Sequence, residues 1–350
     1  MTAKPEILVV GGGIIGASIA WHLADRGARV TVIDGGEPGG IATRNSWAWI
    51  NVSWGNPEPY FRLRAQAMEE WRRLEREIPA VRVAWTGSLN WELPGDRLEA
   101  FAAQHAAWGY DVRCVGRDEA ARIEPSLADP PELAVHAPRE GAVDPLDVTR
   151  VLLSAACERG AMLAAGRFAQ SIEVRGGRVV GVDTENGRLI ADTVVVAAGA
   201  GAAELAATAG FVLPVSAPPA VLAATRPMPR LLNGLVMTPE LQLRQAADGR
   251  LVAAASAEAA VDLLAAMKAL FRPNRTTMDL DFQIVASRPI PRDRLPLVGR
   301  AVGIDGLYFA VTHSGITLAP ALGSMAAEEI LAGRRHPLLD PFGLARLQPC

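Results

Sequence analysis

The chain has 350 residues, of which 50% are hydrophobic, enough for about two domains around a large core. A net charge of −3 gives no general attraction to nucleic acid or to an anionic membrane, so we expect neither partner. The widely spaced Cys114, Cys157 and Cys350 predict neither a disulfide framework nor a metal site. The apolar N-terminal run is rich in glycine and lacks a basic leader. We therefore expect a cytoplasmic protein without a membrane span.

The first predicted element is a strand, a glycine-rich turn and a helix over residues 7–26. Gly11, Gly13 and Gly16 follow an apolar run at once, and an apolar stripe at helical spacing comes after them. In the turn that binds a dinucleotide, the first glycine allows the tight bend and the second lets the pyrophosphate approach the backbone. The third lets the helix pack closely on the strand. Amides at the helix start then face the phosphates.

The second predicted strand, residues 29–33, ends in Asp34. An acid at this point beyond the glycines accepts hydrogen bonds from the ribose hydroxyls of a dinucleotide. The alternative is a glycine-rich loop in which Asp34 only caps the strand end. We favour the dinucleotide site because the turn, the helix and the acid occur together.

Residues 41–51 are rich in small polar side chains and end in aromatic ones. Such a segment could reach back to the phosphates of a cofactor and flank its ring. Alternatively, it is a loop that caps the next helix, with Trp47 and Trp49 in the core. The sequence leaves both interpretations open.

The next segments predict helices and antiparallel strands. Residues 58–78 form an amphipathic pattern whose arginines are expected to lie mostly on a solvated face: Arg62, Arg64, Arg72, Arg73 and Arg76. Residues 81–93 alternate apolar and polar side chains, as strands of an antiparallel sheet do. Helices are expected over residues 97–109 and from residue 117 onward.

Residues 144–199 begin with a well-marked helix. Asp144 is the expected N-cap and Pro145 the first helical residue. Strand signals separated by Gly-Gly and Asn-Gly turns then cover residues 168–190. The apolar run 192–198 ends at Gly199, as a buried parallel strand does at its ligand-facing edge.

The last third predicts a hairpin over 241–251, a helix over 257–271, a strand over 281–285, a rigid loop over 288–296, a strand over 307–311 and a helix over 319–332. Three strands end in glycine turns, over residues 7–16, 193–201 and 307–317. We therefore predict an α/β fold in which one ligand lies across the carboxyl ends of a parallel sheet. A second, antiparallel sheet covers one end of it.

The order of these motifs resembles the FAD-dependent amine oxidoreductase family of D-amino-acid oxidase, glycine oxidase and sarcosine oxidase, over nearly the whole chain. The resemblance rests on residues 11–16 with Asp34, 43–46, 141–145, 194–199, Arg288-Pro289 with Asp293 and 296–299, and 313–320.

The resemblance implies an FAD-binding Rossmann-like domain of the glutathione-reductase type and a second, largely antiparallel β-sheet domain for substrate. It implies that residues 1–80, 141–205 and 286–350 form the FAD-binding domain. Residues 81–140 and 206–285 would form the substrate domain.

The resemblance also implies FAD in an extended pose. The residues that would contact it are Gly11, Gly13, Ile14, Gly16, Asp34, Thr43, Arg44, Asn45, Ser46, Phe168, Ala198, Gly199, Gly299, Ser314, Gly315, Ile316 and Thr317. Phe168 would contact the adenine side through its backbone. The 313–317 turn would place amides at the isoalloxazine carbonyl edge. Members that hold FAD covalently carry a histidine near the position of Trp47, so we predict non-covalent FAD here and no metal.

In glycine oxidase-like members the arginine at the position of Arg288 grips the substrate carboxylate in a bidentate fork. The alternative is a loop arginine that pairs with Asp293. This loop carries two arginines, Arg292 and Arg294, where the family often has proline and glycine, and either could face the cleft. His313 is the titratable group expected near the ring; alternatively it only orients the turn.

The predicted function is FAD-dependent oxidation of the C–N bond of a small amino acid or N-methyl amino acid. Hydride would pass to flavin N5 and the imine would then be hydrolysed. The electron acceptor would be O2 or a carrier, and a homo-oligomer stays open. One alternative is a hydroxy-acid oxidoreductase on the same fold. Another is a flavin-binding subunit without its own turnover, with Trp47, Trp49 and Trp54 on a partner surface.

Overall fold

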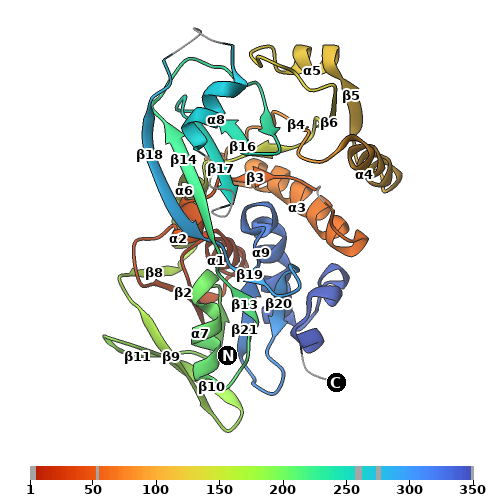
Figure 1. The fold of residues 1–350 in the computed structure, drawn as a ribbon. Helices are drawn as coiled ribbons and strands as arrows, with labels where there is room; N and C mark the ends of the chain where they lie inside the picture. The colour runs from red at the N-terminus through yellow and green to blue at the C-terminus, as the bar shows by residue number, and fades with distance from the viewer. Residues whose placement is uncertain (1–4, 53–54, 257–261, 273–276, 348–350) are drawn as a thin grey trace.

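The computed structural model describes residues 5–52, 55–256, 262–272 and 277–347. Its central element is a six-stranded sheet in the order β20-β21-β12-β1-β2-β8 (Figure 1). The bounds are β1 (Glu6–Val10), β2 (Arg29–Asp34), β8 (Met162–Ala165), β12 (Thr193–Val196), β20 (Leu297–Arg300) and β21 (Leu307–Val311). All neighbours are parallel except β20 and β21. The three strands that end in glycine turns, β1, β12 and β21, are adjacent, which confirms the predicted α/β sheet.

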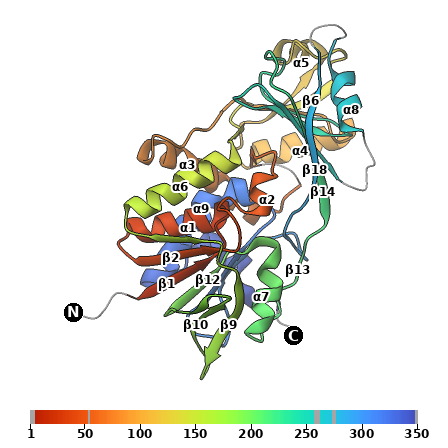
Figure 2. The same ribbon diagram turned by 90° about the vertical axis from the view of Figure 1, so that its left-hand side faces the viewer.

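Helices cover one face of this sheet in two layers, as Figure 2 shows. The helix α1 (Ile14–Asp25) packs against α6 (Pro145–Glu158) and α9 (Gly315–Ala332), and α3 (Glu58–Glu77) packs on α9. The opposite face is covered by α7 (Ala202–Thr208) and by the sheet of β9 (Ala169–Arg175), β10 (Arg178–Thr184) and β11 (Gly187–Ile190). Apolar residues of the strands are therefore buried on both sides, as parallel sheets require.

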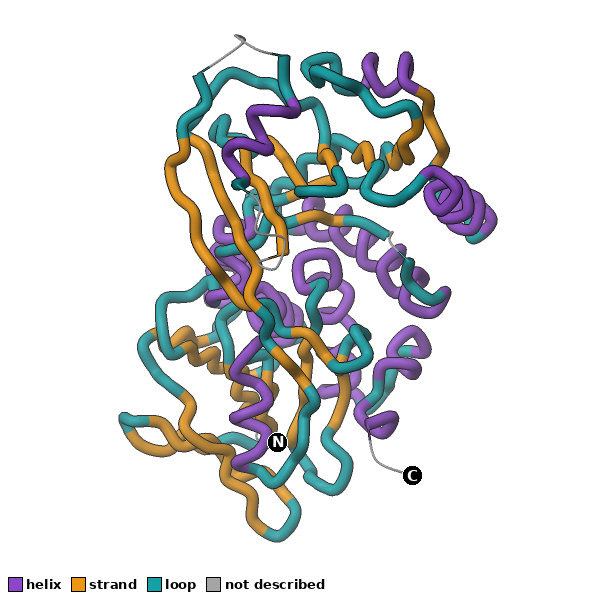
Figure 3. The backbone as a smooth tube through the Cα atoms, in the orientation of Figure 1, coloured by secondary structure: helices purple, strands orange, loops and turns teal. Residues whose placement is uncertain are grey.

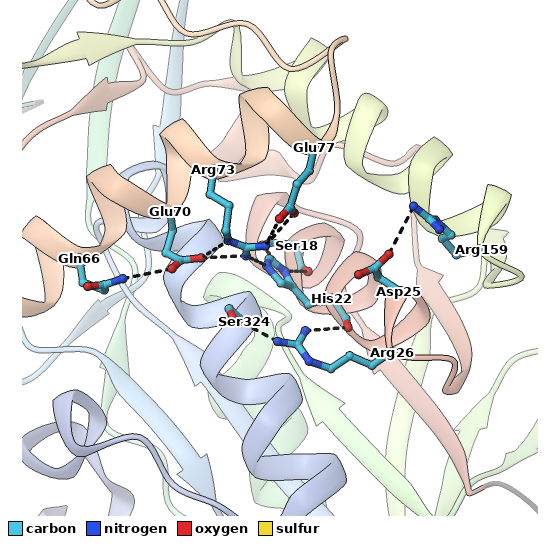
Figure 4. A network of polar contacts seen from close by, with 10 residues as sticks. All are labelled: Ser18, His22, Asp25, Arg26, Gln66, Glu70, Arg73, Glu77, Arg159 and Ser324. Atoms are coloured by element: carbon cyan, nitrogen blue, oxygen red, sulfur yellow. Dashed lines mark hydrogen bonds and ion pairs between the residues drawn. The ribbon is translucent and has the colours of Figure 1, made fainter.

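A buried histidine joins three of these helices (Figure 4). The Nδ1 atom of His22 lies 2.8 Å from the carbonyl oxygen of Ser18, and Arg73 donates to Nε2 at 2.9 Å. The carbonyl can only accept and the guanidinium can only donate, so the ring carries its proton on Nδ1 and is neutral. Burial, opposed in part by the bond to Ser18, lowers the pKa of His22 to about 3. On α9, a Cβ at Gly323 would lie 2.6 Å from Nδ1 of His22, so only glycine allows this approach.

The second sheet has eight strands in the order β18-β14-β17-β16-β15-β4-β6-β5. The bounds are β4 (Ser88–Asn90), β5 (Arg113–Gly116), β6 (Leu133–Ala137), β14 (Pro219–Thr225), β15 (Leu235–Met237), β16 (Gln242–Gln245), β17 (Leu251–Ser256) and β18 (Leu280–Ser287). Only β4 and β15 are parallel neighbours. The paired strands β14 and β18 run from this sheet down toward the parallel sheet, as Figure 3 shows.

Short elements complete the two parts. Around the second sheet lie α4 (Gly95–Ala107), α5 (Arg117–Ile123) and α8 (Leu263–Leu270). Near the junction lie α2 (Ile41–Arg44), the strand pair β3 (Trp49–Ile50) and β7 (Gly141–Ala142), and the pair β13 (Val215–Ser216) and β19 (Ile290–Pro291). The chain ends in the 3₁₀ helices η3 (Pro337–Phe342) and η4 (Leu344–Leu347), and η1 (Gly199–Gly201) follows β12.

Most predicted elements are confirmed, with three differences. Of residues 81–93 only 88–90 form a strand, with an isolated bridge at Ala84. The last helix begins at Gly315 because the glycine turn itself forms its first turn. The predicted helix 257–271 is observed as α8, and residues 257–261 lie outside the described part. The strands of the second sheet come from 88–137 and 219–287, while the division into two domains stays a prediction. Among the described helices, none is both long and apolar enough to span a bilayer.

Candidate active site

A cavity of about 1910 Å³ lies between the two sheets. Its lining includes the carboxyl ends of β1, β12 and β21 on one side and residues of β14, β16, β17 and β18 on the other. Sites for drug-sized ligands occupy about 300–1,000 Å³, so this cavity can hold a dinucleotide and a second small molecule.

The glycine turn after β1 packs closely on neighbouring backbone because it lacks side chains. Gly11 has φ 110°, and a Cβ there would lie 2.5 Å from the carbonyl oxygen of Ala197. A Cβ at Gly16 would lie 1.9 Å from the oxygen of Gly11, which explains the close packing of helix on strand. Gly13, the N-cap of α1, supplies no side chain, so the first amides of the helix border the cavity. A helix start of this kind can bind an anion such as a pyrophosphate.

The carboxylate of Asp34 lies at one end of the cavity. It accepts hydrogen bonds from the amides of Gly12 at 2.7 Å and Gly36 at 2.9 Å. The side chain of Phe168 packs over Gly35 and is 59% exposed. Asp34 thus does two things at once: it caps the loop and it presents a carboxylate to the cavity, beside an open aromatic ring that suits an adenosine.

The segment after α2 forms one wall. Thr43 accepts a hydrogen bond from the amide of Ile14 at 3.2 Å, which ties this segment to the start of α1. Trp47 is buried in a small apolar cluster and its carbonyl accepts from the buried Arg244, while Trp49 is half-buried at the cavity. Trp47 therefore lies in the core, as the second alternative predicts, while contact of this segment with a cofactor stays a prediction.

The start of α9 forms the adjoining wall. Its N-cap, Ser314, makes no side-chain cap bond, so the positive end of the helix faces the cavity. The Thr317 hydroxyl donates to the carbonyl of Trp49 at 3.0 Å, and the indole of Trp71 donates to the carbonyl of Ile316 at 3.0 Å. These bonds fix the helix start against the Trp49 wall.

The prediction that Arg64 lies on a solvated face is wrong. Its side chain is 4% exposed, borders the cavity, and donates to Ser314 at 2.7 Å and to the backbone and side chain of Asn51. Helical phase was the available signal, because Arg64 lies one turn from Tyr60 and two from Trp71 on the buried face of α3. Asn51, the last residue of the segment 41–51 for which the sequence left a cofactor contact open, borders the same cavity.

His313 lies among three arginines at the cavity. Burial and the charges of Arg64, Arg288 and Arg294 lower its pKa to about 4, so the ring is neutral at pH 7. Its ring meets that of Tyr60 edge to face. Within the described part of the chain, its buried Nδ1 has no hydrogen-bond partner.

Arg288 also borders the cavity, and the alternative pairing with Asp293 does not form. Asp293 instead accepts from Arg346 at 2.8 Å. Among the residues that the structure describes, none forms a hydrogen bond or an ion pair with the Arg288 guanidinium. Burial, followed by the charge of Arg294, lowers the pKa of Arg288. Of the two added loop arginines, Arg294 borders the cavity and Arg292 does not.

The cavity gathers all but two of the predicted site residues. Those at its lining are Gly11, Gly13, Ile14, Asp34, Thr43, Arg44, Asn45, Ser46, Phe168, Ala198, Gly199, Arg288, His313, Ser314, Gly315, Ile316 and Thr317. Gly16 lies behind the turn, in the packing position predicted for it. Gly299 lies on β20 away from the cavity, where a Cβ would meet Arg335 at 2.9 Å, so its expected place at the cofactor is corrected. Ligation by the others stays a prediction.

An extended FAD fits this lining. The start of α1, Asp34, Trp49 and the start of α9 all border this one cavity. The cavity is electropositive where Arg64 meets Ser314 at the start of α9, as suits the electron-rich carbonyl edge of a flavin.

Comparison with known proteins agrees with this geometry. The family model described as DAO, FAD dependent oxidoreductase, matches residues 6–329. The uncharacterized oxidoreductase YurR of Bacillus subtilis is 31% identical, with 96% of this chain and 97% of that protein covered. The glycine oxidase of Geobacillus kaustophilus is 28% identical, covering 99% and 98%. The crystal structure of L-proline dehydrogenase from P. horikoshii superposes with a TM-score of 0.87 at 25% identity, and 98% of each chain is covered.

Proposed function

Because the chain belongs to the DAO family of FAD-dependent oxidoreductases, enzymes that use FAD to oxidise amines or amino acids, we propose that its substrate is a small amino acid or N-methyl amino acid. The observation that carries this proposal is the Arg288 guanidinium, which borders the same cavity as the dinucleotide site and has no described partner. A carboxylate matches a guanidinium in a bidentate fork.

In this proposal the amides at the start of α1 hold the pyrophosphate and Asp34 holds the ribose. The wall at Trp49 and the start of α9 border the ring, without a covalent link. When bound, FAD supplies a hydride acceptor at N5. Arg288 orients the substrate by its carboxylate, so that the Cα–H bond is aimed at the ring.

The substrate reacts as the free amine. Its Cα gives up hydride, the nitrogen lone pair forms the C=N bond, and water then hydrolyses the imine to an oxo acid and an amine. His313 is neutral at pH 7, so it serves as a polar contact for the substrate and not as a cationic acid. No side-chain base is required for the hydride step.

The test is anaerobic mixing of the FAD-loaded protein with a panel of amino acids and N-methyl amino acids, read by flavin absorbance. Bleaching by amino acids supports the proposal. Bleaching by 2-hydroxy acids alone would favour the hydroxy-acid alternative instead. Reoxidation of the bleached protein in air then separates O2 from a carrier as the electron acceptor.

The partner-surface alternative finds no support in the tryptophans. Trp47 is buried and Trp49 borders the cavity, while Trp54 lies outside the described residues.

A further inference from the structure

Two guanidinium groups of the loop around β19 border the cavity without a counter-charge. In the part of the chain that the structure describes, neither the Arg288 nor the Arg294 side chain makes a hydrogen bond or an ion pair. The two lie close enough for the charge of Arg294 to lower the pKa of Arg288, and both act on His313. Both residues are exposed and border the same cavity, so its lining carries two positive charges that are accessible to a bound anion.

The other charged groups nearby already have partners. Arg64 is bound by Asn51 and Ser314, and Asp293 by Arg346. Glu240 also borders the cavity, and its carboxylate accepts from Thr238 at 2.9 Å.

The acids Asp34, Glu37, Glu92 and Glu204 also line the cavity. Among the residues that the structure describes, none of these acids forms an ion pair with Arg288 or Arg294. Of the charged side chains of the loop around β19 that border the cavity, Asp293 is paired with Arg346, so Arg288 and Arg294 are the ones that remain for a ligand.

The backbone of Arg294 also has an unfavourable conformation. Its φ is 61°, in the left-handed region that is unfavourable for a residue other than glycine. The conformation is fixed locally, because the Arg294 amide donates to Pro291 and the Leu295 amide donates to Asp293. Strained residues of this kind gather at ligand-binding sites.

We propose that the substrate carries two carboxylates, the amino-acid carboxylate at Arg288 and a second one at Arg294. The second carboxylate belongs to the side chain or to the N-substituent of the amino acid. This inference rests on the proposed function for the role of Arg288. One carboxylate can satisfy one guanidinium fork, so a second cation beside it selects a substrate with a second acid.

The test compares matched ligands on the FAD-loaded protein. Reduction by N-carboxymethylglycine is compared with sarcosine, and reduction by aspartate with asparagine, in both enantiomers. Binding of malonate is compared with acetate through the flavin absorbance shift, which needs no turnover. We expect each dicarboxylate to bind at least tenfold more tightly than the matched monocarboxylate. We also expect salt to weaken the binding of the dicarboxylate more steeply.

Two variants locate the effect. In Arg294→Gln the ratio of the affinity for the dicarboxylate to the affinity for the matched monocarboxylate falls toward one. Arg294→Gly gives the same result while removing the backbone strain, so a folding defect cannot imitate it. Arg292→Gln is the matched control, because Arg292 lies in the same loop but outside the cavity lining, and it keeps the full preference.

The outcomes are separable. If monocarboxylic amino acids reduce the flavin but no dicarboxylate preference depends on Arg294, this inference is overturned and the proposed function stands. If malonate binds in an Arg294-dependent way while no amino acid reduces the flavin, the proposed function fails and the two-carboxylate site stands.

Discussion

Trp49 donates its indole N–H to the carboxylate of Glu140 at 2.8 Å, beside the strand pair that joins β3 to β7. Glu140 is fully buried and also accepts from Ser88 at 2.6 Å and from Tyr110 at 2.8 Å. Burial, together with this carboxylate, raises the pKa of Tyr110, so the phenol remains a donor. One carboxylate therefore anchors a cavity wall to the second sheet.

Replacing this carboxylate should destabilise the protein. Glu140→Gln keeps the shape but replaces one accepting oxygen by an amide NH2 group. At least one of the three present donors, the Trp49 indole, the Ser88 hydroxyl and the Tyr110 phenol, then loses its acceptor, and we expect a loss of about 2–3 kcal/mol in the free energy of unfolding. Urea unfolding of the FAD-free protein measures it. Glu69→Gln is the control, because Glu69 lies in exposed ion pairs with Arg72 and Arg139 and should change stability by less than about 0.5 kcal/mol. Equal stabilities of the two variants would contradict the anchoring role.

Adding a side chain in the glycine turn after β1 should cause a selective loss of cofactor. In Gly16→Ala the new Cβ would lie 1.9 Å from a backbone oxygen, so the turn must open and purified protein should carry little flavin. The control is Gly116→Ala at the N-cap of α5, where the nearest atom to a new Cβ is 3.9 Å away. Flavin absorbance per protein reads both, and full flavin content in Gly16→Ala would show that another segment holds the pyrophosphate.

Arg288 predicts an effect on substrate affinity more than on turnover. A hydrogen bond to a charged group contributes about 1.5–3 kcal/mol, so Arg288→Gln should raise KM about 10- to 150-fold. Steady-state kinetics with the best substrate of the panel measures this, and Arg292→Gln should keep the wild-type KM. An unchanged KM for Arg288→Gln would remove Arg288 from substrate binding.

Because His22 is buried in its neutral form, we expect the stability of the protein to depend on pH. Its pKa is about 3 in the folded protein against 6.5 for the free side chain, so its contribution is complete above pH 6.5 and is lost as the pH falls toward 3. Between pH 6 and 4 the free energy of unfolding should fall more steeply in the wild type than in His22→Gln, by up to about 1.4 kcal/mol per pH unit. Urea titrations across this range give the slopes. Parallel slopes would mean that the folded protein holds a protonated ring.

Local signals account for what the sequence predicted well. The β1 turn, the Asp144 cap of α6, which accepts from the amides of Leu146 and Asp147, and the hairpins at Gly-Gly and Asn-Gly all depend on residues close in the chain. Arg64 was expected on a solvated face because its helix is rich in arginine. Its position along the helix, in phase with Tyr60 and Trp71, places it on the buried face instead.

Other features depend on contacts that no local pattern encodes. The parallel neighbours β4 and β15 are brought together by the long return of the chain between them. The sequence left open which of Arg292 and Arg294 borders the cavity, and only the folded loop shows that it is Arg294. The partner of Asp293 is Arg346, near the end of the chain. Only the fold could therefore show that Asp293 does not pair with Arg288.

The sheet order has a consequence for biosynthesis. The strand β1 pairs with β12, and β12 with β21, so the floor of the nucleotide site closes only when the chain has been made almost to its end. Until then the nascent polypeptide displays apolar strands without their neighbours, a state prone to aggregation on the ribosome. Fragments that stop before Leu307 should therefore depend on chaperones and fail to retain flavin.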